Sequence, residues 1–185
     1  RYIQFATANQ FYMIANNFGV DYDNVRYAMR EGYERAHSVP GAGFAAGPCL
    51  LKDTMQLAAF SSNNFLLGHA AMMINEGLPN YIIENLRKKH DLANTSVGIL
   101  GMAFKADIDD IRDSLSFKLW KILRFHGAKV YCSDEFAKNP EFVPKEELIR
   151  KSEVIIVAVP HSAYKSVNIP KGKEVVDLWK IIKRE

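Results

Sequence analysis

The chain has 185 residues, of which 48% are hydrophobic and 24% are charged, a balance typical of a globular protein with one domain or two small ones. Its formal net charge is +3, and this mild, dispersed basic excess does not require a nucleic-acid partner. No apolar run approaches the roughly 20 residues that span a bilayer, so no membrane partner is expected. Two cysteines give no disulfide framework, which favours a cytoplasmic location.

Apolar residues recur at helical spacing through the first half of the chain. Four helices are expected there, over residues 2–18, 23–32, 49–62 and 65–89. A loop rich in glycine and proline, over residues 34–48, separates the second helix from the third. Gly77 and Pro79 predict a kink in the fourth helix. The sequence opens at Arg1 within a helical pattern and without a cap, from which we expect a piece of a longer chain.

The hydrophobic period then changes to that of short apolar strands separated by helices. Strands are expected over residues 96–101, 129–134, 154–159 and 173–177, with helices over residues 115–125 and 146–151 between them. This alternation is typical of an α/β domain with a doubly wound parallel sheet. We therefore predict an all-helical domain over residues 1–92 and an α/β domain over residues 93–185.

Cys49 lies where the Gly/Pro-rich loop meets the third helix. Free N–H groups and the helix dipole at a helix N-terminus favour a thiolate, the nucleophilic form of cysteine. Lys52 and Asp53 follow within one turn and offer a cation and a possible base. Buried cysteines are often inert, and Cys132, which lies in a strand pattern, is expected to be structural.

The loop after the first strand, residues 101–114, combines small residues with two cations, Lys105 and Arg112, and leads into a helix. Such a loop, at the carboxyl end of a parallel strand, is a plausible phosphate site. Gly98 and Gly101 do not complete the G-x-G-x-x-G fingerprint, so ordinary NAD binding is not expected in this sheet. The five histidines show no metal-ligand spacing, and no metal site is expected.

Two motifs together resemble those of the UDP-glucose/GDP-mannose dehydrogenase family. The family motif G-G-x-C-L-x-K-D is matched at its cysteine, leucine, lysine and aspartate by Cys49, Leu50, Lys52 and Asp53. A second motif, G-x-A-F-K-x-x-T-D-D-x-R-x-S, is met by residues 101–114, with Ile108 in place of threonine. The resemblance implies a helical central, dimerising region followed by a Rossmann-like domain that binds UDP-sugar, and it implies that the family's N-terminal NAD domain is absent.

The resemblance further implies NAD-dependent oxidation of the C6 alcohol of a UDP-hexose or UDP-N-acetylhexosamine to the uronic acid. Cys49 would carry a thiohemiacetal and then a thioester, and Asp53 would position or activate water. Lys52 and Arg112 resemble cofactor contacts. Residues that resemble substrate contacts are Arg35, Gly43, Phe44, Ala45, Phe104 and Lys105. Trp179 stands where the family often has an arginine near the sugar, and the sugar itself stays undecided.

Two other functions remain open from the residues alone. The chain could be a non-catalytic module that binds UDP-sugar and forms a homodimer through its long fourth helix. It could also be a cysteine acyl-transfer or hydrolase enzyme that uses Cys49, although no histidine is obviously placed to act as its base. A chain without the NAD domain should produce no NADH.

Overall fold

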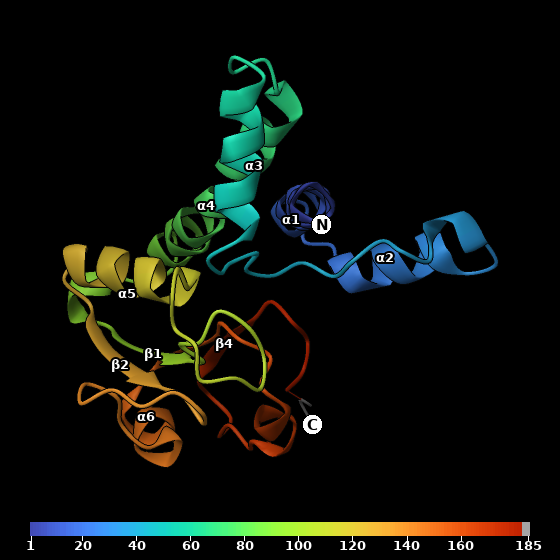
Figure 1. The fold of residues 1–185 in the computed structure, drawn as a ribbon. Coiled ribbons are helices and arrows are strands. Elements are labelled where there is room, and N and C mark those ends of the chain that lie inside the picture. Colours follow the sequence, from blue (N-terminus) through green and yellow to red (C-terminus); the bar gives the residue numbers. More distant parts are fainter. Residues whose placement is uncertain (183–185) are drawn as a thin grey trace. The chain divides into compact units, whose positions relative to one another are not determined.

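The computed structural model describes residues 1–182, so residues 183–185 of the second expected domain lie outside the described part. The contacts divide the chain into two compact units, residues 1–78 and 79–185, and each is described by itself. We call them the helical unit and the α/β unit (Figure 1). The boundary expected between residues 92 and 93 stays a prediction.

All four expected helices of the first half are present, with bounds within two residues of those expected. They are α1 (Tyr2–Asn17), α2 (Tyr22–Arg30), α3 (Leu50–Phe60) and α4 (Leu66–Arg87), with a short 3-10 helix, η1 (Glu34–Ala36), in the loop before α3. Gly19, at φ 70°, follows the end of α1, and the side chain of Asp21 caps α2 by accepting a hydrogen bond from the Asp23 N–H. Pro79 lies inside α4, where the helix continues to Arg87.

The buried face of α1 consists largely of small residues. Phe11 and Ile14, two large apolar residues of this helix, are 41% and 47% exposed. The buried positions are instead occupied mainly by small or polar residues, among them Ala6, Ala8 and Asn9. Ala42 and Ala45 of the following loop belong to the same buried clusters as α1, and a loop backbone can approach a helix this closely only where the side chains are small.

The α/β unit contains one parallel sheet of four strands, β1 (Ser96–Leu100), β2 (Lys129–Ser133), β3 (Val154–Val157) and β4 (Glu174–Asp177). Their order is β2-β1-β3-β4, and this confirms the α/β fold with a parallel sheet that the sequence predicts. Two 3-10 helices accompany the sheet, η2 (Leu92–Asn94) before β1 and η3 (Ser162–Ser166) after β3.

Helices α5 (Leu115–Phe125) and α6 (Lys145–Lys151) cover opposite faces of this sheet (Figure 1). Ser114 caps α5 by accepting from the Ser116 N–H. Gly98 of β1 allows the close approach of α6, because a Cβ atom at this position would stand 2.4 Å from Cδ2 of Leu148. Leu148 in turn belongs to a core cluster with residues of β1 and β3.

The strand order places a topological switch point between β1 and β3. From β1 the chain passes to β2 on one side, and from β2 it returns across β1 to β3 on the other side. In open α/β sheets, ligands bind beyond the carboxyl ends of the strands at such a point. The loops that follow β1 and β3 are therefore the natural positions for a binding site in this unit.

Across residues 1–182, no helix has both the length and the apolar character needed to cross a membrane.

Candidate functional site

Cys49 is the N-cap residue of α3, as the sequence predicts, and it is exposed and free of any disulfide. Its carbonyl accepts the first hydrogen bond of the helix, from the Asp53 N–H at 2.8 Å. The Cys49 side chain makes no capping hydrogen bond among the described residues. The thiol is therefore accessible at the first turn of a helix, which a nucleophilic cysteine requires.

Lys52 and Asp53 lie on this same turn, and their side chains face solvent. The Lys52 ammonium is 3.4 Å from a carboxylate oxygen of Asp53, and the two side chains are 59% and 64% exposed. An ion pair this exposed contributes little to stability, because water screens both charges. Both side chains thus remain available to a ligand or to a water molecule.

The loop before Cys49 is held by a buried asparagine. Asn9 of α1 donates to the Gly43 carbonyl at 3.0 Å and accepts from the Gly43 N–H at 2.9 Å, so one amide satisfies both backbone groups of Gly43. Asn9 also donates to Asn75 of α4 at 2.9 Å, and Asn75 donates to the Tyr2 carbonyl. Asn9 and Asn75 are both fully buried, where an unpaired amide would be costly.

The predicted substrate residues of this loop are largely enclosed by the helical unit. The backbone polar groups of Gly43 are engaged by Asn9, while Phe44 and Ala45 are 6% and 2% exposed. Tyr22 and Arg26 of α2 donate to carbonyls at the start of the loop, those of Pro40 and Val39. Arg35, the other predicted substrate residue here, is exposed in η1.

In the α/β unit, residues 101–114 form the loop that we call the β1 loop. Asp134, the first residue after β2, fixes the start of this loop. One of its carboxylate oxygens, Oδ2, accepts from the N–H groups of Met102 at 2.6 Å and Ala103 at 2.9 Å. The other oxygen, Oδ1, accepts from the N–H groups of Phe136 and Ala137.

A fifth hydrogen bond reaches Asp134 from His161, whose Nε2 lies 3.1 Å from Oδ2. Burial opposes ionisation of this carboxyl group, but the hydrogen bonds from His161 and from three backbone N–H groups outweigh it. The pKa of Asp134 is therefore held well below its ordinary value.

The far side of the β1 loop is fixed to the loop after β3. Asp107 has a left-handed backbone, φ 57°, and its carboxylate accepts from the N–H and the hydroxyl of Ser162 at 2.8 and 3.0 Å. The hydrogen bond from the Ser162 N–H is the main reason that the pKa of Asp107 lies below its ordinary value. Its own N–H donates to Nδ1 of His161 at 3.0 Å.

The three predicted site residues of the β1 loop lie in this anchored segment. Phe104 is half-buried, and its N–H donates to the Asp110 carbonyl, whereas Lys105 is exposed. The Arg112 side chain is 73% exposed and makes a two-pronged pair with the Asp110 carboxylate, with Nη2 2.7 Å from Oδ2. Lys105 and Arg112 are thus exposed cations, of a kind that suits phosphate groups.

Trp179 has a packing role in the structure. Its indole N–H donates to the Ala158 carbonyl at 3.0 Å, and its ring packs against the core cluster of the α/β unit. The donor of this side chain is therefore occupied by the chain itself.

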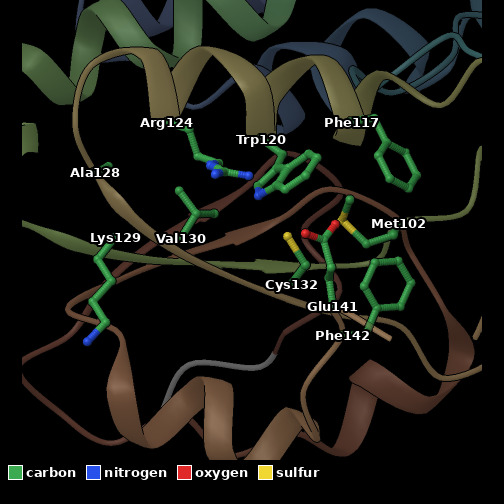
Figure 2. Close-up of a pocket in the computed structure, with 10 residues that line it drawn as sticks. All are labelled: Met102, Phe117, Trp120, Arg124, Ala128, Lys129, Val130, Cys132, Glu141 and Phe142. Carbon is green, nitrogen blue, oxygen red and sulfur yellow. The ribbon is translucent and has the colours of Figure 1, made fainter. Parts of the chain in front are cut away.

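A cavity of about 370 Å³ runs along the edge strand β2, beneath α5 (Figure 2). Phe117, Trp120 and Arg124 project into it from α5, and the Arg124 guanidinium lies 5.0 Å from the centre of the Trp120 ring. Cys132 lines its floor and is only 6% exposed. Burial is the main reason that the pKa of the Cys132 thiol is raised to about 12. This thiol is therefore neutral and unreactive near pH 7.

Within residues 1–182, no cluster of histidine, cysteine or acidic side chains could hold a metal ion. The chemical features thus fall into two groups, one in each unit. The first is an exposed thiol with a neighbouring cation and carboxylate, and the second is an anchored cationic loop at the switch point of a parallel sheet.

A parallel sheet of this order, with helices on both faces, defines a Rossmann-like α/β domain. Residues 98–184 match the model of the UDP-glucose/GDP-mannose dehydrogenase family, UDP binding domain. The UDP-N-acetyl-D-mannosamine dehydrogenase of Pyrococcus horikoshii is 29% identical over 174 residues, which cover 91% of this chain and 41% of that protein. The UDP-glucose 6-dehydrogenase AglM of Haloferax volcanii is 34% identical over 134 residues, covering 70% of this chain and 31% of that protein.

Solved structures agree with these sequence matches. The UDP-D-ManNAc dehydrogenase of Pyrococcus horikoshii has a TM-score of 0.84 at 27% identity, covering 100% of this chain and 46% of that one. A UDP-glucose dehydrogenase of Pyrobaculum islandicum also has a TM-score of 0.84, at 28% identity, covering 96% of this chain and 44% of that one. Residues 98–184 thus belong to the UDP-binding domain of the UDP-glucose/GDP-mannose dehydrogenase family, and the chain spans less than half the length of the curated relatives described here.

Three residues that organise the two groups were missed by reasoning from the sequence, namely Asn9, Asp134 and His161. Asp134 and His161 each follow an apolar strand, and polar residues at such positions meet at the carboxyl edge of a parallel sheet. This signal was applied only to the loop after β1. Asn9 gave no comparable signal, because a single polar residue in a helix is usually exposed.

The two cysteines should differ sharply in reactivity, because only Cys49 is accessible and the pKa of the Cys132 thiol is raised to about 12. We expect a disulfide reagent such as 5,5′-dithiobis(2-nitrobenzoate) to label one thiol rapidly at pH 7.5 and the second only after unfolding. Cys49→Ser should abolish the rapid phase, and Cys132→Ala should retain it. Equal labelling rates for both thiols in the folded protein would contradict the assignment.

Asp134→Asn should destabilise the α/β unit, because all five groups around this carboxylate are donors. In either orientation, the amide nitrogen of asparagine would face at least two of them. We expect a loss of about 2–5 kcal/mol in the free energy of unfolding at pH 7, measured by urea titration. The exposed Asp109→Asn, in the β1 loop that Asp134 anchors, should change it by less than about 0.5 kcal/mol.

This stabilisation should also depend on pH in a defined direction. The folded pKa of Asp134 is depressed, so its contribution is fully present above the unfolded pKa of about 4 and is lost as the pH falls towards the folded value. The difference between the unmodified protein and Asp134→Asn should therefore shrink below about pH 4. A difference that stayed constant with pH would show that the carboxylate charge is not its source.

Proposed function

We propose that this chain is the substrate-binding and cysteine-bearing part of an NAD-dependent nucleotide-sugar 6-dehydrogenase. The observation that carries the proposal is the exposed Cys49 thiol at the first turn of α3, in a chain whose residues 98–184 match a UDP-binding domain. The family and the relatives support nucleotide-sugar dehydrogenation as the reaction. The substrate would be a UDP-hexose or a UDP-N-acetylhexosamine.

NAD, bound in turn as two molecules, would supply the hydride acceptor. Lys52 and Arg112 would hold its phosphates, since both are exposed cations near neutral pH. Each of them already pairs with a carboxylate, which orients the cation and leaves part of its surface to a ligand. Each of the two cations is thus of a kind that suits a phosphate of the dinucleotide.

Cys49 would act on the aldehyde produced from the C6 alcohol. Its sulfur adds to the carbonyl carbon and its proton passes to the carbonyl oxygen, so that the aldehyde is held as a thiohemiacetal. Loss of a second hydride from that carbon, together with the proton of its hydroxyl group, would give a thioester. Water then attacks the thioester carbon, and the products are the carboxylate and the free thiol.

Asp53 is the residue of the first turn that can serve the hydrolytic step. Its carboxylate lies one turn from Cys49 and is exposed, so it can accept a hydrogen bond from the attacking water. The Lys52 ammonium lies 3.4 Å from this carboxylate and could orient it.

Each unit carries residues that we assign to the nucleotide sugar. Phe104 and Lys105 of the β1 loop would contact the nucleotide diphosphate, and the loop of Gly43, Phe44 and Ala45 would shape the sugar site. Arg35 would reach the site of a neighbouring subunit. A homodimer through the central helices is supported by large apolar side chains that the helical unit leaves exposed, among them Phe18, Phe60, Leu66, Leu67 and Met73.

A second function is favoured by the kind of domain that the family model describes. Residues 98–184 match a UDP-binding domain, so these residues could serve a non-catalytic UDP-sugar-binding and dimerisation module. Both functions share the UDP site and differ only in the use of Cys49. A cytoplasmic location remains a prediction from the two unpaired cysteines.

Binding of UDP tests the site in the α/β unit. Lys105→Ala should weaken the affinity about ten- to a hundredfold in titration calorimetry, because it removes a charge-assisted hydrogen bond to a phosphate. Lys171→Ala, which removes an exposed cation from the loop before β4, should leave the affinity unchanged. Equal affinities of the Lys105→Ala variant and the unmodified chain would exclude this role of Lys105.

The role of Cys49 requires an assay of the chain produced together with an NAD-binding domain. Cys49→Ser should then release no acid product and should stall with substrate or aldehyde bound, whereas Cys132→Ser should still form acid. The chain alone should make no NADH from any UDP-sugar. Acid production at an undiminished rate by Cys49→Ser would contradict the cysteine mechanism.

A further inference from the structure

His161 is a buried ionisable residue to which the proposed reaction gives no role. It follows β3 by four residues and begins the turn into η3, and its side chain is 0% exposed. Its ring contacts two aromatic rings, with centroid distances of 5.0 Å to Phe136 and 5.2 Å to Tyr164. A polar ring enclosed in this way must find partners for both of its nitrogens.

The two partners of His161 fix where its proton lies. The Asp107 N–H, 3.0 Å from Nδ1, can only donate, so Nδ1 must be an acceptor and carry no proton. Asp134 is a carboxylate that already accepts four backbone N–H groups, so Nε2, 3.1 Å from its Oδ2, must carry the proton. The two hydrogen-bond partners therefore select the tautomer that carries its proton on Nε2.

This ring joins the loops that follow three strands of the sheet. Through Asp134 it is linked to the end of β2, and at the same oxygen, Oδ2, the N–H groups of Met102 and Ala103 begin the β1 loop. Through Asp107 it reaches the far side of the β1 loop. Only residues 104–106 lie between the two anchors, and these include Phe104 and Lys105.

We propose that His161 is a positioning residue that sets the conformation of residues 104–106 for binding a nucleoside diphosphate. This inference rests on the proposed UDP site. A loop that is ordered before the ligand arrives loses less conformational entropy on binding, and a cation on it is already directed at the phosphates. His161 acts through the loop and does not itself contact the ligand.

The tautomer can be measured directly on the unmodified chain. In a long-range ¹H–¹⁵N correlation spectrum at pH 7, we expect His161 to show a protonated Nε2 and an unprotonated Nδ1. We also expect slow hydrogen exchange at the Ala103 and Asp107 amides. Protonation at Nδ1, or rapid averaging between the two tautomers, would overturn the proposal whatever the variants show.

The functional test is a double-mutant cycle on UDP affinity, measured by calorimetry. His161→Phe keeps the ring and removes both hydrogen bonds, and it should weaken UDP binding about tenfold. The matched control is His126→Phe, at the half-buried residue that ends α5, which should leave the affinity unchanged. Because His161 acts through the loop that carries Lys105, His161→Phe should have little further effect in the Lys105→Ala background.

The proposal would be overturned if the factors by which the two single variants weaken UDP binding multiplied in the double variant. It would also be overturned if His161→Phe bound UDP with undiminished affinity. Should His161→Phe not fold, His161→Asn would replace it, because its amide can still accept from the Asp107 N–H. It should also weaken UDP binding, through loss of the link to Asp134, and unchanged affinity would overturn the proposal. If Lys105→Ala itself binds UDP normally, the failure lies in the proposed UDP site.

Discussion

The α/β unit depends on a single buried carboxylate. Asp134 accepts four backbone N–H groups and one imidazole N–H, and these five donors come from the loops that follow β1, β2 and β3. A negative charge surrounded by donors draws these loops to one point at the carboxyl edge of the sheet. The shape of the β1 loop, with its two cations, follows from this arrangement.

In the helical unit, an uncharged side chain fixes an irregular loop in a similar way. The loop that leads to Cys49 has little regular structure, and the amide of Asn9 engages both backbone groups of Gly43 as a neighbouring strand would. Asn75 completes the arrangement by linking Asn9 to the start of α1. In each unit, a buried polar side chain from a regular element fixes an irregular segment that bears the candidate chemistry.

The elements of the fold could be predicted closely from the sequence. The range of α5 was predicted without error, and β1 differs by one residue, because hydrophobic period and capping residues such as Ser114 are local signals. The exposed position of Cys49 at a helix start also follows from its local sequence. The family motifs then marked the residues of both candidate groups.

What could not be predicted depends on contacts between distant residues. Asn9 and Gly43 are 34 residues apart, and Asp134 and His161 are 27 apart, so no periodicity connects them. The exposure of Phe11 and Ile14 on α1 has a related reason. Apolar spacing identifies a stripe, but it cannot show that a loop backbone, rather than a neighbouring helix, lies against the adjacent small residues.

Helix α4 contains the point at which the two units divide, between Leu78 and Pro79. Proline has no N–H, so the main-chain hydrogen bond from position 79 to the Asn75 carbonyl cannot form. The turn around Pro79 therefore has one main-chain hydrogen bond fewer than the other turns of this helix and bends more easily. The turn around Pro79 is therefore the least rigid part of α4. The part of the helix before this turn is held by the Asn75 side chain, which is hydrogen-bonded to Asn9 and to the Tyr2 carbonyl of α1.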